Sequence, residues 1–209
     1  MMNSRQKIPE ILKRLKKAYP AAKTALVFKS PFELLVATVL SAQATDVLVN
    51  KVTESLFRKY RSIRDYADAP IDSLREDVRS VNFYKTKAAH IQETARILLG
   101  HFHGKVPSTM EELITLPGVA RKTANIILSD AFGIHEGIAV DTHVKRLAKR
   151  LALTSHDNPV KVEKDLMEIT PQKEWGNISH LLILHGRQIC PARNPKHEIC
   201  TLSDICPSH

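Results

Sequence analysis

The sequence predicts an all-α protein, with roughly nine or ten helices along the chain. Apolar residues recur at every third or fourth position in one segment after another, which is the spacing of a half-buried helix. No segment shows the alternation of apolar and polar residues that predicts a strand. Of the 209 residues, 43% are hydrophobic, which is enough for a proper core, and no internal repeat or long linker interrupts them.

The first two helices are predicted near the N-terminus. The segment 1–20 is expected to form an amphipathic helix, because apolar residues fall at i, i+3, i+4 and i+7: Ile8, Ile11, Leu12 and Leu15. The next helix begins at a capping box, in which Ser30 caps, Pro31 occupies the first turn and Glu33 completes the box. The residues that follow, through Leu40, are apolar almost all round, which is typical of a helix in the middle of a bundle.

Later helices are predicted from the same spacing and from further caps. Apolar sets at helical spacing indicate three of them: Val49, Val52, Leu56 and Tyr60; Ile71, Leu74, Val78 and Val81; and Ala88, Ile91, Ala95 and Leu98. A second capping box is expected at 108–111. Another helix is expected to begin at 158–159, with an inner face made of Val162, Leu166 and Ile169.

The charge of the chain indicates a polyanionic partner. The net charge of +9 makes nucleic acid the usual candidate, with a basic protein that lacks such a partner as the alternative. Charged residues interrupt the N-terminal helix, so no signal peptide is predicted, and the most apolar stretch, 31–40, is too short to span a bilayer. We therefore expect a cytoplasmic protein without membrane contact, associated with the nucleoid if its source is bacterial.

The segment 116–124 predicts two helices joined by a Pro–Gly turn. A short helix from Ser108 is expected to end at Pro117–Gly118, and a new helix to start near Ala120. The turn amides and the N-terminus of the second helix then point outward together, which makes a phosphate site without sequence preference. An ordinary helix–turn–helix corner is the alternative that stays open.

Two residues near this turn are candidates for chemistry. Lys122 lies in the first turn of the second helix, and partial burial together with the positive end of a helix favours the unprotonated amine that a nucleophile needs. Asp141 precedes an apolar helical stripe and is a natural N-cap, whose carboxylate could also stabilise positive charge on a reacting sugar. The simpler interpretations are a solvated or phosphate-paired lysine and a carboxylate that only caps. His143 is interpreted as a structural or phosphate-contacting residue rather than a catalytic one.

Several motifs, in this order along the chain, resemble the endonuclease III family of helix-hairpin-helix DNA glycosylases. They are Leu-Ser-Ala-Gln-Ala-Thr-Asp at 40–46, Leu-Pro-Gly-Val at 116–119, Arg-Lys-Thr-Ala-Asn at 121–125, Val-Asp-Thr-His at 140–143 and Leu-His-Gly-Arg at 184–187. The resemblance extends from residue 31 to residue 206, nearly the whole chain. Motifs in the right order make it far stronger than any one of them alone.

The resemblance implies two helical lobes with a DNA-binding cleft between them. One lobe, residues 23–133, would be a six-helix barrel that contains the helix-hairpin-helix. The other would combine residues 1–22 with residues 134–209 and end in an iron–sulfur-type loop at 190–206. A monomer of this kind would bind damaged double-stranded DNA, remove oxidised pyrimidines, and nick the abasic site by β-elimination through a Schiff base on Lys122, with Asp141 as the charged partner.

The resemblance also implies which residues contact DNA. Gln43 would fill the space left by the extruded nucleotide, and Phe83 would insert from a second wedge loop at 81–84, although a core position for Phe83 is equally open. The other expected contacts come from the hairpin, from the helix after Asp141 and from the metal loop: Pro117, Gly118, Val119, Ala120, Arg121, His143, Arg187, Arg193 and Lys196.

The chain departs from the family pattern at two positions. All three cysteines lie in the last 20 residues, and such a cluster in a reducing compartment indicates a metal site more than disulfides. The ligand run is Cys190, His197, Cys200 and Cys206, with histidine where the family has a fourth cysteine for its [4Fe–4S] cluster. A cluster is expected, with structural zinc or no metal as alternatives. Ala120 replaces the usual hairpin glycine, which would carry strain if φ were positive and none if φ were helical.

Three other functions stay open as alternatives. A related glycosylase of different base specificity, such as an adenine-mismatch enzyme, would lack the nucleophilic lysine that Lys122 supplies. A non-catalytic helix-hairpin-helix DNA-binding module would not need Gln43, Lys122 and Asp141 together. A redox or metal-sensing protein would leave the basic charge and the hairpin unexplained.

Overall fold

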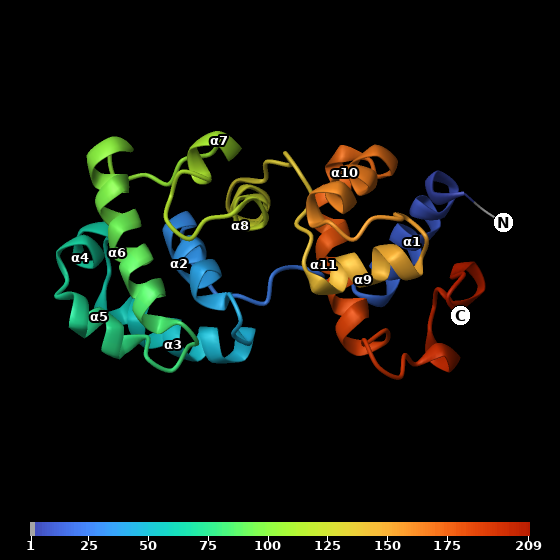
Figure 1. The fold of residues 1–209 in the computed structure, drawn as a ribbon, viewed down its shortest axis with the longest axis horizontal. Coiled ribbons are helices and arrows are strands. Elements are labelled where there is room, and N and C mark those ends of the chain that lie inside the picture. The colour runs from blue at the N-terminus through green and yellow to red at the C-terminus, as the bar shows by residue number, and fades with distance from the viewer. Residues whose placement is uncertain (1–2) are drawn as a thin grey trace. The chain divides into compact units, whose positions relative to one another are not determined.

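The computed structural model describes residues 3–209, and all the regular structure within them is helical, as the sequence predicts (Figure 1). Eleven α-helices, one π-helical turn and three short 3-10 segments make up the described chain. None of the helices in this part of the chain is long and apolar enough to cross a membrane. The chain divides into two compact units, one of residues 24–134 and one of the segments on either side, and each is described by itself.

The unit of residues 24–134 is built around a buried central helix. Its helices are α2 (Pro31–Ser41), α3 (Asp46–Lys59), α4 (Ile63–Asp68), α5 (Ile71–Asp77), α6 (Tyr84–His101), α7 (Met110–Leu113) and α8 (Arg121–Ile127), and the π-helical turn Leu128–Phe132 continues α8. Helix α2 packs against α3, α6 and α8, and every residue from Leu34 to Leu40 is buried. This confirms the central position that its apolar sequence predicts.

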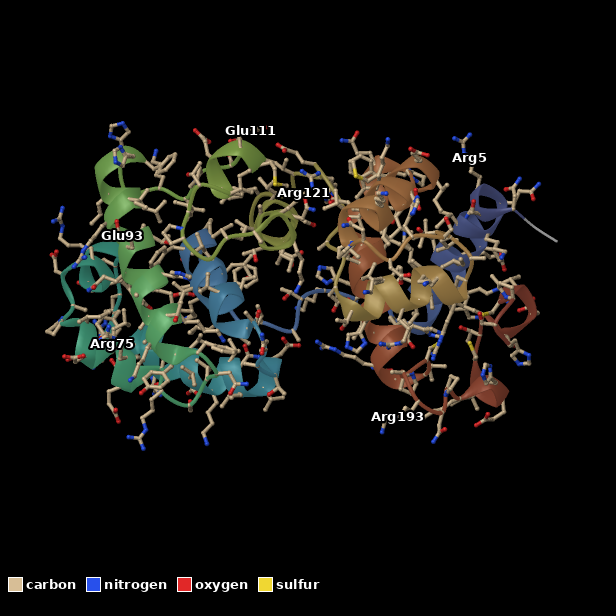
Figure 2. All side chains as sticks on the ribbon, in the orientation of Figure 1. Arg5, Arg75, Glu93, Glu111, Arg121 and Arg193 are labelled. Carbon is tan, nitrogen blue, oxygen red and sulfur yellow. The ribbon has the colours of Figure 1, made fainter. Side chains whose placement is uncertain are left out.

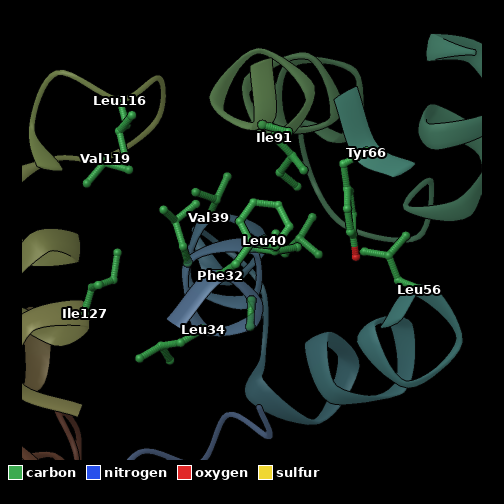
Figure 3. Close-up of a cluster of buried hydrophobic side chains, with 14 of the residues drawn as sticks. Phe32, Leu34, Val39, Leu40, Leu56, Tyr66, Ile91, Leu116, Val119 and Ile127 are labelled. Atoms are coloured by element: carbon green, nitrogen blue, oxygen red, sulfur yellow. The ribbon is translucent and has the colours of Figure 1, made fainter. Parts of the chain in front are cut away.

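The core around α2 draws side chains from most of this unit. Figure 3 shows Leu34, Val39 and Leu40 of α2 among side chains from the other helices and from the hairpin: Leu56, Tyr66, Ile91, Leu116, Val119 and Ile127. Each fully buried leucine contributes roughly 1.5–3 kcal/mol relative to an exposed one. The hairpin therefore packs on the same core as α2, because Leu116 and Val119 belong to that core.

The second unit joins the N-terminal helix to the C-terminal part of the chain. Its elements are α1 (Ser4–Ala18), α9 (Thr142–Arg150), α10 (Pro159–Ile169), α11 (Trp175–Gln188) and the 3-10 segments Gln172–Glu174, His197–Ile199 and Ser203–Ile205. Helix α11 packs against α9 and α1. The apolar face predicted for the N-terminal helix is buried in this core, and the first two residues of that predicted helix lie outside the described residues.

Of the helix starts predicted at Ser30, 108–111 and 158–159, the first and last are confirmed and the middle one is wrong. Ser30 caps α2 and Asn158 caps α10, each through a side-chain oxygen that accepts a backbone N–H. The second capping box is wrong: Thr109, not Ser108, accepts the N–H of Glu112, and α7 begins at Met110. Glu112 accepts the Thr109 hydroxyl proton instead of the N-cap amide, so the reciprocal half of the box is not formed.

The first capping box also closes differently from the prediction. The Glu33 carboxylate accepts the N–H of Lys29, one residue before the cap, rather than the N–H of Ser30. The apolar set that begins at Ile71 is not one helix either. Helix α5 ends at Asp77, and a turn follows in which the Val81 N–H donates to the Val78 carbonyl. Val78 and Val81 remain buried because the turn packs on the same core as the helix.

Candidate functional site

The hairpin at 116–120 is a tight turn held by helix α6. Leu116 and Val119 of this hairpin are buried, and Gly118 between them has φ +77°, the left-handed region that favours glycine. A Cβ on Gly118 would lie 2.8 Å from the His90 Nδ1 of α6. One turn further along α6, the Thr94 hydroxyl donates to the Pro117 carbonyl at 3.4 Å. Helix α6 thus packs against the hairpin and holds it in position, while Gly118 stays exposed.

Ala120 adopts a backbone conformation that is open to any residue. Its φ and ψ are −88° and 168°, an extended conformation at the N-cap of α8. The strain that a positive φ would bring is therefore absent, although the backbone is extended rather than helical. Alanine offers no side-chain oxygen to the first turn of α8, so a cap of the ordinary kind is not formed there.

Lys122 is the second residue of α8 and follows this N-cap directly. Its side chain is exposed, as is that of Arg121 (labelled in Figure 2). The partial burial considered from the sequence is therefore not present in the protein alone. The Lys122 amine is free to meet a ligand at the start of the helix, and any desolvation of it must come from that ligand.

Asp141 occupies the predicted N-cap of α9, in the second unit. Its Oδ1 accepts the Val144 N–H at 2.8 Å, which confirms the predicted cap. The side chain is half-buried, so one carboxylate oxygen is held rigidly by the helix N-terminus. A carboxylate in this position is fixed in direction, as electrostatic stabilisation of a developing cation requires.

His143 is the second residue of α9 and packs where α9 meets α11. Arg146 donates to its Nδ1 at 3.1 Å and to the Gly186 carbonyl at 2.9 Å. Burial lowers the pKa of His143 below its ordinary value, and the nearby Asp141 carboxylate only partly opposes this. A Cβ on Gly186 would lie 3.1 Å from Arg146, which explains the glycine of the 184–187 motif as a close approach between helices.

The two residues predicted to wedge into DNA lie on exposed turns of the unit 24–134. Gln43 has φ +54° and an exposed side chain, in the turn that follows α2. Phe83 has φ +59°, forms the N-cap of α6, and is 63% exposed. The alternative that Phe83 is a core residue is therefore wrong. A large aromatic side chain this exposed is available to another molecule.

The predicted metal ligands gather at one small hollow of the second unit. Cys190, His197, Cys200 and Cys206 line a cavity of about 20 Å³, and the three thiols are free. Arg150 donates to the Cys190 Sγ at 3.0 Å, and the Cys206 thiol donates to the Arg150 carbonyl at 3.5 Å. The rings of His197 and His209 meet edge to face with centroids 5.0 Å apart.

Next to Cys200, His185 of α11 is buried as a neutral base. Its Nε2 lies 3.5 Å from the Cys200 Sγ and its Nδ1 lies 3.2 Å from the Tyr19 hydroxyl. Burial lowers the pKa of His185 to about 4 and raises the pKa of the Cys200 thiol. The cysteine loop is thus tied to both α1 and α11.

The described side chains do not form a ready site for a single metal ion. Within residues 3–209, no three His, Cys, Asp or Glu side chains are placed to hold one metal ion together. A tetrahedral zinc site needs four donors about 2.0–2.3 Å from one point, so a preformed zinc site is not present in the described chain. The three thiols and the imidazole that line the hollow are donor types that bind both iron–sulfur clusters and zinc.

The other basic residues predicted to contact DNA lie on this loop or shortly before it. Arg187 lies in the last turn of α11, and Arg193 and Lys196 lie between Cys190 and His197. All three are exposed, and Figure 2 shows the Arg193 side chain extending away from the ribbon. Exposed cations on a short loop are suited to phosphate contact.

Sequence reasoning missed the residues that hold the hairpin and the exposed turns in place. His90 and Thr94 contact the hairpin, and Asn82 and Lys87 contact the turn after α2. One signal was available: Lys87 lies four residues before Ile91, on the buried stripe of α6, where a lysine needs a partner.

Comparison with known proteins places these features in a family. The profile described as "HhH-GPD superfamily base excision DNA repair protein" matches residues 36–172. Endonuclease III of Synechocystis sp. is 49% identical over 100% of this chain and 95% of the relative. Endonuclease III of Bacillus subtilis is 43% identical over 99% of this chain and 94% of the relative.

Solved structures agree with the sequence relatives. A trapped endonuclease III–DNA covalent intermediate is 46% identical, with a TM-score of 0.93, and the match covers 99% of this chain and 97% of that one. A thermostable thymine-DNA glycosylase, 23% identical with a TM-score of 0.86, shares the fold; its match covers 98% of this chain and 97% of that one. The chain is thus a helix-hairpin-helix protein of base excision DNA repair. Within that class it belongs to the endonuclease III family, and it is a DNA glycosylase and abasic-site lyase.

Proposed function

We propose that this enzyme removes oxidised pyrimidines from double-stranded DNA and then breaks the strand by β-elimination, with Lys122 as nucleophile and Asp141 as its charged partner. The observation that carries the proposal is the position of Lys122, an exposed amine in the first turn of α8 directly after the hairpin. A relative 46% identical over nearly the full chain forms a covalent intermediate with DNA, which supports a nucleophile in this family.

The chemistry follows from these groups in order. A base inside a duplex is out of reach, so the damaged nucleotide is flipped out at a cost of a few kcal/mol. The unprotonated Lys122 amine attacks C1′ of the sugar: the N–C1′ bond forms, the glycosidic bond breaks, and the base leaves with the bonding electrons and takes up a proton. The Asp141 carboxylate, held at its N-cap, stabilises the positive charge that develops on the sugar.

Strand cleavage follows once the aminosugar opens. The lone pair of the Lys122 nitrogen forms a C=N bond to C1′, the C1′–O4′ bond breaks and O4′ takes up a proton, which gives an open-chain imine. The protonated C1′ imine makes the C2′ proton acidic. Loss of that proton sends its electron pair into a C2′–C3′ double bond and expels the 3′ phosphate, with the C3′–O bond broken. Water then hydrolyses the imine and releases Lys122. The lysine thus serves both base removal and strand scission.

DNA is held by backbone groups and by exposed cations. The Pro117–Val119 turn, Ala120 and the first turn of α8 with Arg121 offer amides to one phosphate, and His143 at the start of α9 contacts another. Arg187, Arg193 and Lys196 add long-range attraction, in keeping with the net charge of +9. We propose that the protein binds damaged duplex DNA as a monomer in the cytoplasm.

The loop 190–206 is proposed to hold a [4Fe–4S] cluster through Cys190, His197, Cys200 and Cys206. Bound there, the cluster would crosslink the loop and keep Arg193 and Lys196 in place for phosphate contact. A histidine ligand raises the potential of an iron–sulfur cluster relative to a thiolate ligand. Elemental analysis and visible absorption test the assignment: we expect near four iron atoms per chain and loss of the visible absorption on chelation. A pure protein with neither iron nor zinc would show that this loop holds neither metal.

Borohydride trapping tests the proposed nucleophile. Wild-type protein is expected to form a covalent complex with DNA that contains thymine glycol or an abasic site, because borohydride reduces the imine to a stable amine. Lys122→Gln should lose the complex and keep its DNA affinity. Lys51→Gln is the matched control, since Lys51 is an exposed lysine on α3 of the same unit. Undiminished trapping by Lys122→Gln would refute the assignment.

A further inference from the structure

The two exposed turns that carry Gln43 and Phe83 are joined to each other. The Asn82 Nδ2 donates to the Gln43 carbonyl at 2.8 Å, across 39 residues of sequence. Asn82 is the residue before Phe83, so a single side chain connects the two turns. We call residues 42–45 the first turn and residues 81–83 the second turn.

A buried lysine of α6 fastens the first turn to the core. Lys87 is 5% exposed, and its Nζ donates to the Leu40 carbonyl at 2.7 Å and to the Ala42 carbonyl at 2.5 Å. These carbonyls lie at the C-terminal end of α2, where backbone oxygens lack partners within the helix and carry partial negative charge. Burial lowers the pKa of Lys87, and the two carbonyl bonds favour its charged form in return.

The same helix also begins at the second turn. The Lys87 N–H donates to the Phe83 carbonyl at 3.0 Å, which is the first hydrogen bond of α6. Lys87 therefore reaches the second turn through its backbone and the first turn through its side chain. Asn82 and Lys87 together form a bridge between the turns, one at the surface and one in the core.

Both turns hold a non-glycine residue in the left-handed region. Gln43 has φ +54° and Phe83 has φ +59°. Such a residue stays in that region only when its surroundings fix it. The bridge formed by Asn82 and Lys87 supplies that constraint on one side of each turn, and it leaves both side chains exposed.

We propose that Asn82 and Lys87 are positioning residues that make the two turns one rigid element, so that Gln43 and Phe83 enter the base stack together. The proposal rests on the proposed function, in which the damaged nucleotide is flipped out of the duplex, and on the expectation that Gln43 fills the vacated space while Phe83 inserts from the second turn. A wedge that is rigid before binding loses little conformational freedom when it enters DNA. The bridge thus acts on the opening of the duplex and leaves the attack by Lys122 unchanged.

Asn82→Asp tests the bridge with almost no change in shape. An ionised aspartate cannot donate a hydrogen bond, and it places a negative charge next to the Gln43 carbonyl. Asn50→Asp is the matched control: the Asn50 Nδ2 donates to the Ala25 carbonyl at 2.8 Å in the same unit, and neither turn is involved. At Lys87 two variants are compared. Lys87→Met removes the donor and should slow duplex opening, whereas Lys87→Arg keeps a cationic donor and should retain part of the wild-type opening rate.

Stopped-flow fluorescence of 2-aminopurine beside a thymine glycol measures duplex opening under single-turnover conditions. We expect Asn82→Asp to open the duplex about tenfold more slowly than the wild type, because it loses one hydrogen bond. We expect Asn50→Asp to open the duplex at the wild-type rate. Borohydride trapping on a preformed abasic site, where no base has to be unpaired, should be unchanged in both variants. Normal opening by Asn82→Asp, or equal slowing on both DNAs, would overturn the proposal.

Hydrogen exchange in the free protein separates this inference from the proposed function. Amides of the first turn should exchange faster in Asn82→Asp than in the wild type or in Asn50→Asp, because the bridge is a property of the protein alone. Unchanged exchange would refute the bridge whatever the enzyme does. A wild-type protein that traps no DNA would refute the proposed function and leave the exchange result to decide the bridge by itself.

Discussion

Replacing Gly118 by alanine should destabilise the protein more than the same change at Gly133. Both glycines are exposed, both have a positive φ, +77° and +68°, and both lie in the unit of residues 24–134. They differ in what a new Cβ would meet. At Gly118 it would lie 2.8 Å from the His90 Nδ1, whereas at Gly133 no heavy atom lies within 4 Å.

The difference between the two substitutions can be estimated from these contacts. An L-residue in the left-handed region costs roughly 1–2 kcal/mol, and this applies to both positions. The alanine also reduces the entropy of the unfolded chain equally in both variants, so that effect cancels in the comparison. At Gly118 the His90 ring must also leave its rotamer, which adds roughly 0.5–1.5 kcal/mol. Before the common entropy effect is subtracted, Gly118→Ala is therefore expected to cost about 1.5–3.5 kcal/mol and Gly133→Ala about 1–2 kcal/mol.

Urea unfolding of both variants, followed by circular dichroism, measures these values. DNA affinity provides a second comparison, since a shifted hairpin should weaken phosphate contact in Gly118→Ala and not in Gly133→Ala. In a His90→Ala background the extra cost at Gly118 should vanish, because the clashing ring is gone. Equal destabilisation by the two single substitutions would show that His90 does not press on the hairpin, and the reasoning would fail.

Three further predictions concern Asp141, His143 and the basic loop. Asp141→Asn keeps a good N-cap but removes the charge, so stability should hold while base excision slows markedly; unchanged turnover would make Asp141 only a cap. Folding lowers the pKa of His143, so as the pH falls below about 6.5 the unfolded chain takes up a proton there before the folded chain does, and stability should decline. The urea midpoint of unfolding should therefore fall less between pH 7.5 and 5.5 in His143→Gln than in the wild type, and an equal fall in both would contradict this. Arg193→Gln should lower the slope of log Kd against log salt by roughly 0.9, and an unchanged slope would remove this residue from the interface.

Local signals in the sequence predicted the helices well because they depend on neighbouring residues. The caps at Ser30, Asn158 and Asp141 join side chains to amides two or three residues away, and the structure contains all three. The end of α5 was not predictable from periodicity. Val78 and Val81 continue the apolar spacing of a helix, but they are buried from a turn that packs on the same core.

Contacts between distant residues were beyond the reach of the sequence. Nothing in the local pattern indicates that Asn82 bonds to a carbonyl 39 residues away. The helical spacing places Lys87 on the buried stripe of α6, but it does not indicate which carbonyls the lysine meets. The strain considered at Ala120 depended on one backbone angle, and the structure gives an extended value for it. The positions of Lys122 and Asp141 at helix starts followed from the sequence, since the turn and the cap are local features.

The most direct test of the account is to locate the covalent bond itself. After borohydride reduction with abasic-site DNA, digestion with protease and nuclease followed by mass spectrometry should find the sugar remnant on the peptide that contains Lys122, because only an amine forms the reducible imine. A remnant on another lysine or on the N-terminal amine, with Lys122 unmodified, would contradict the account.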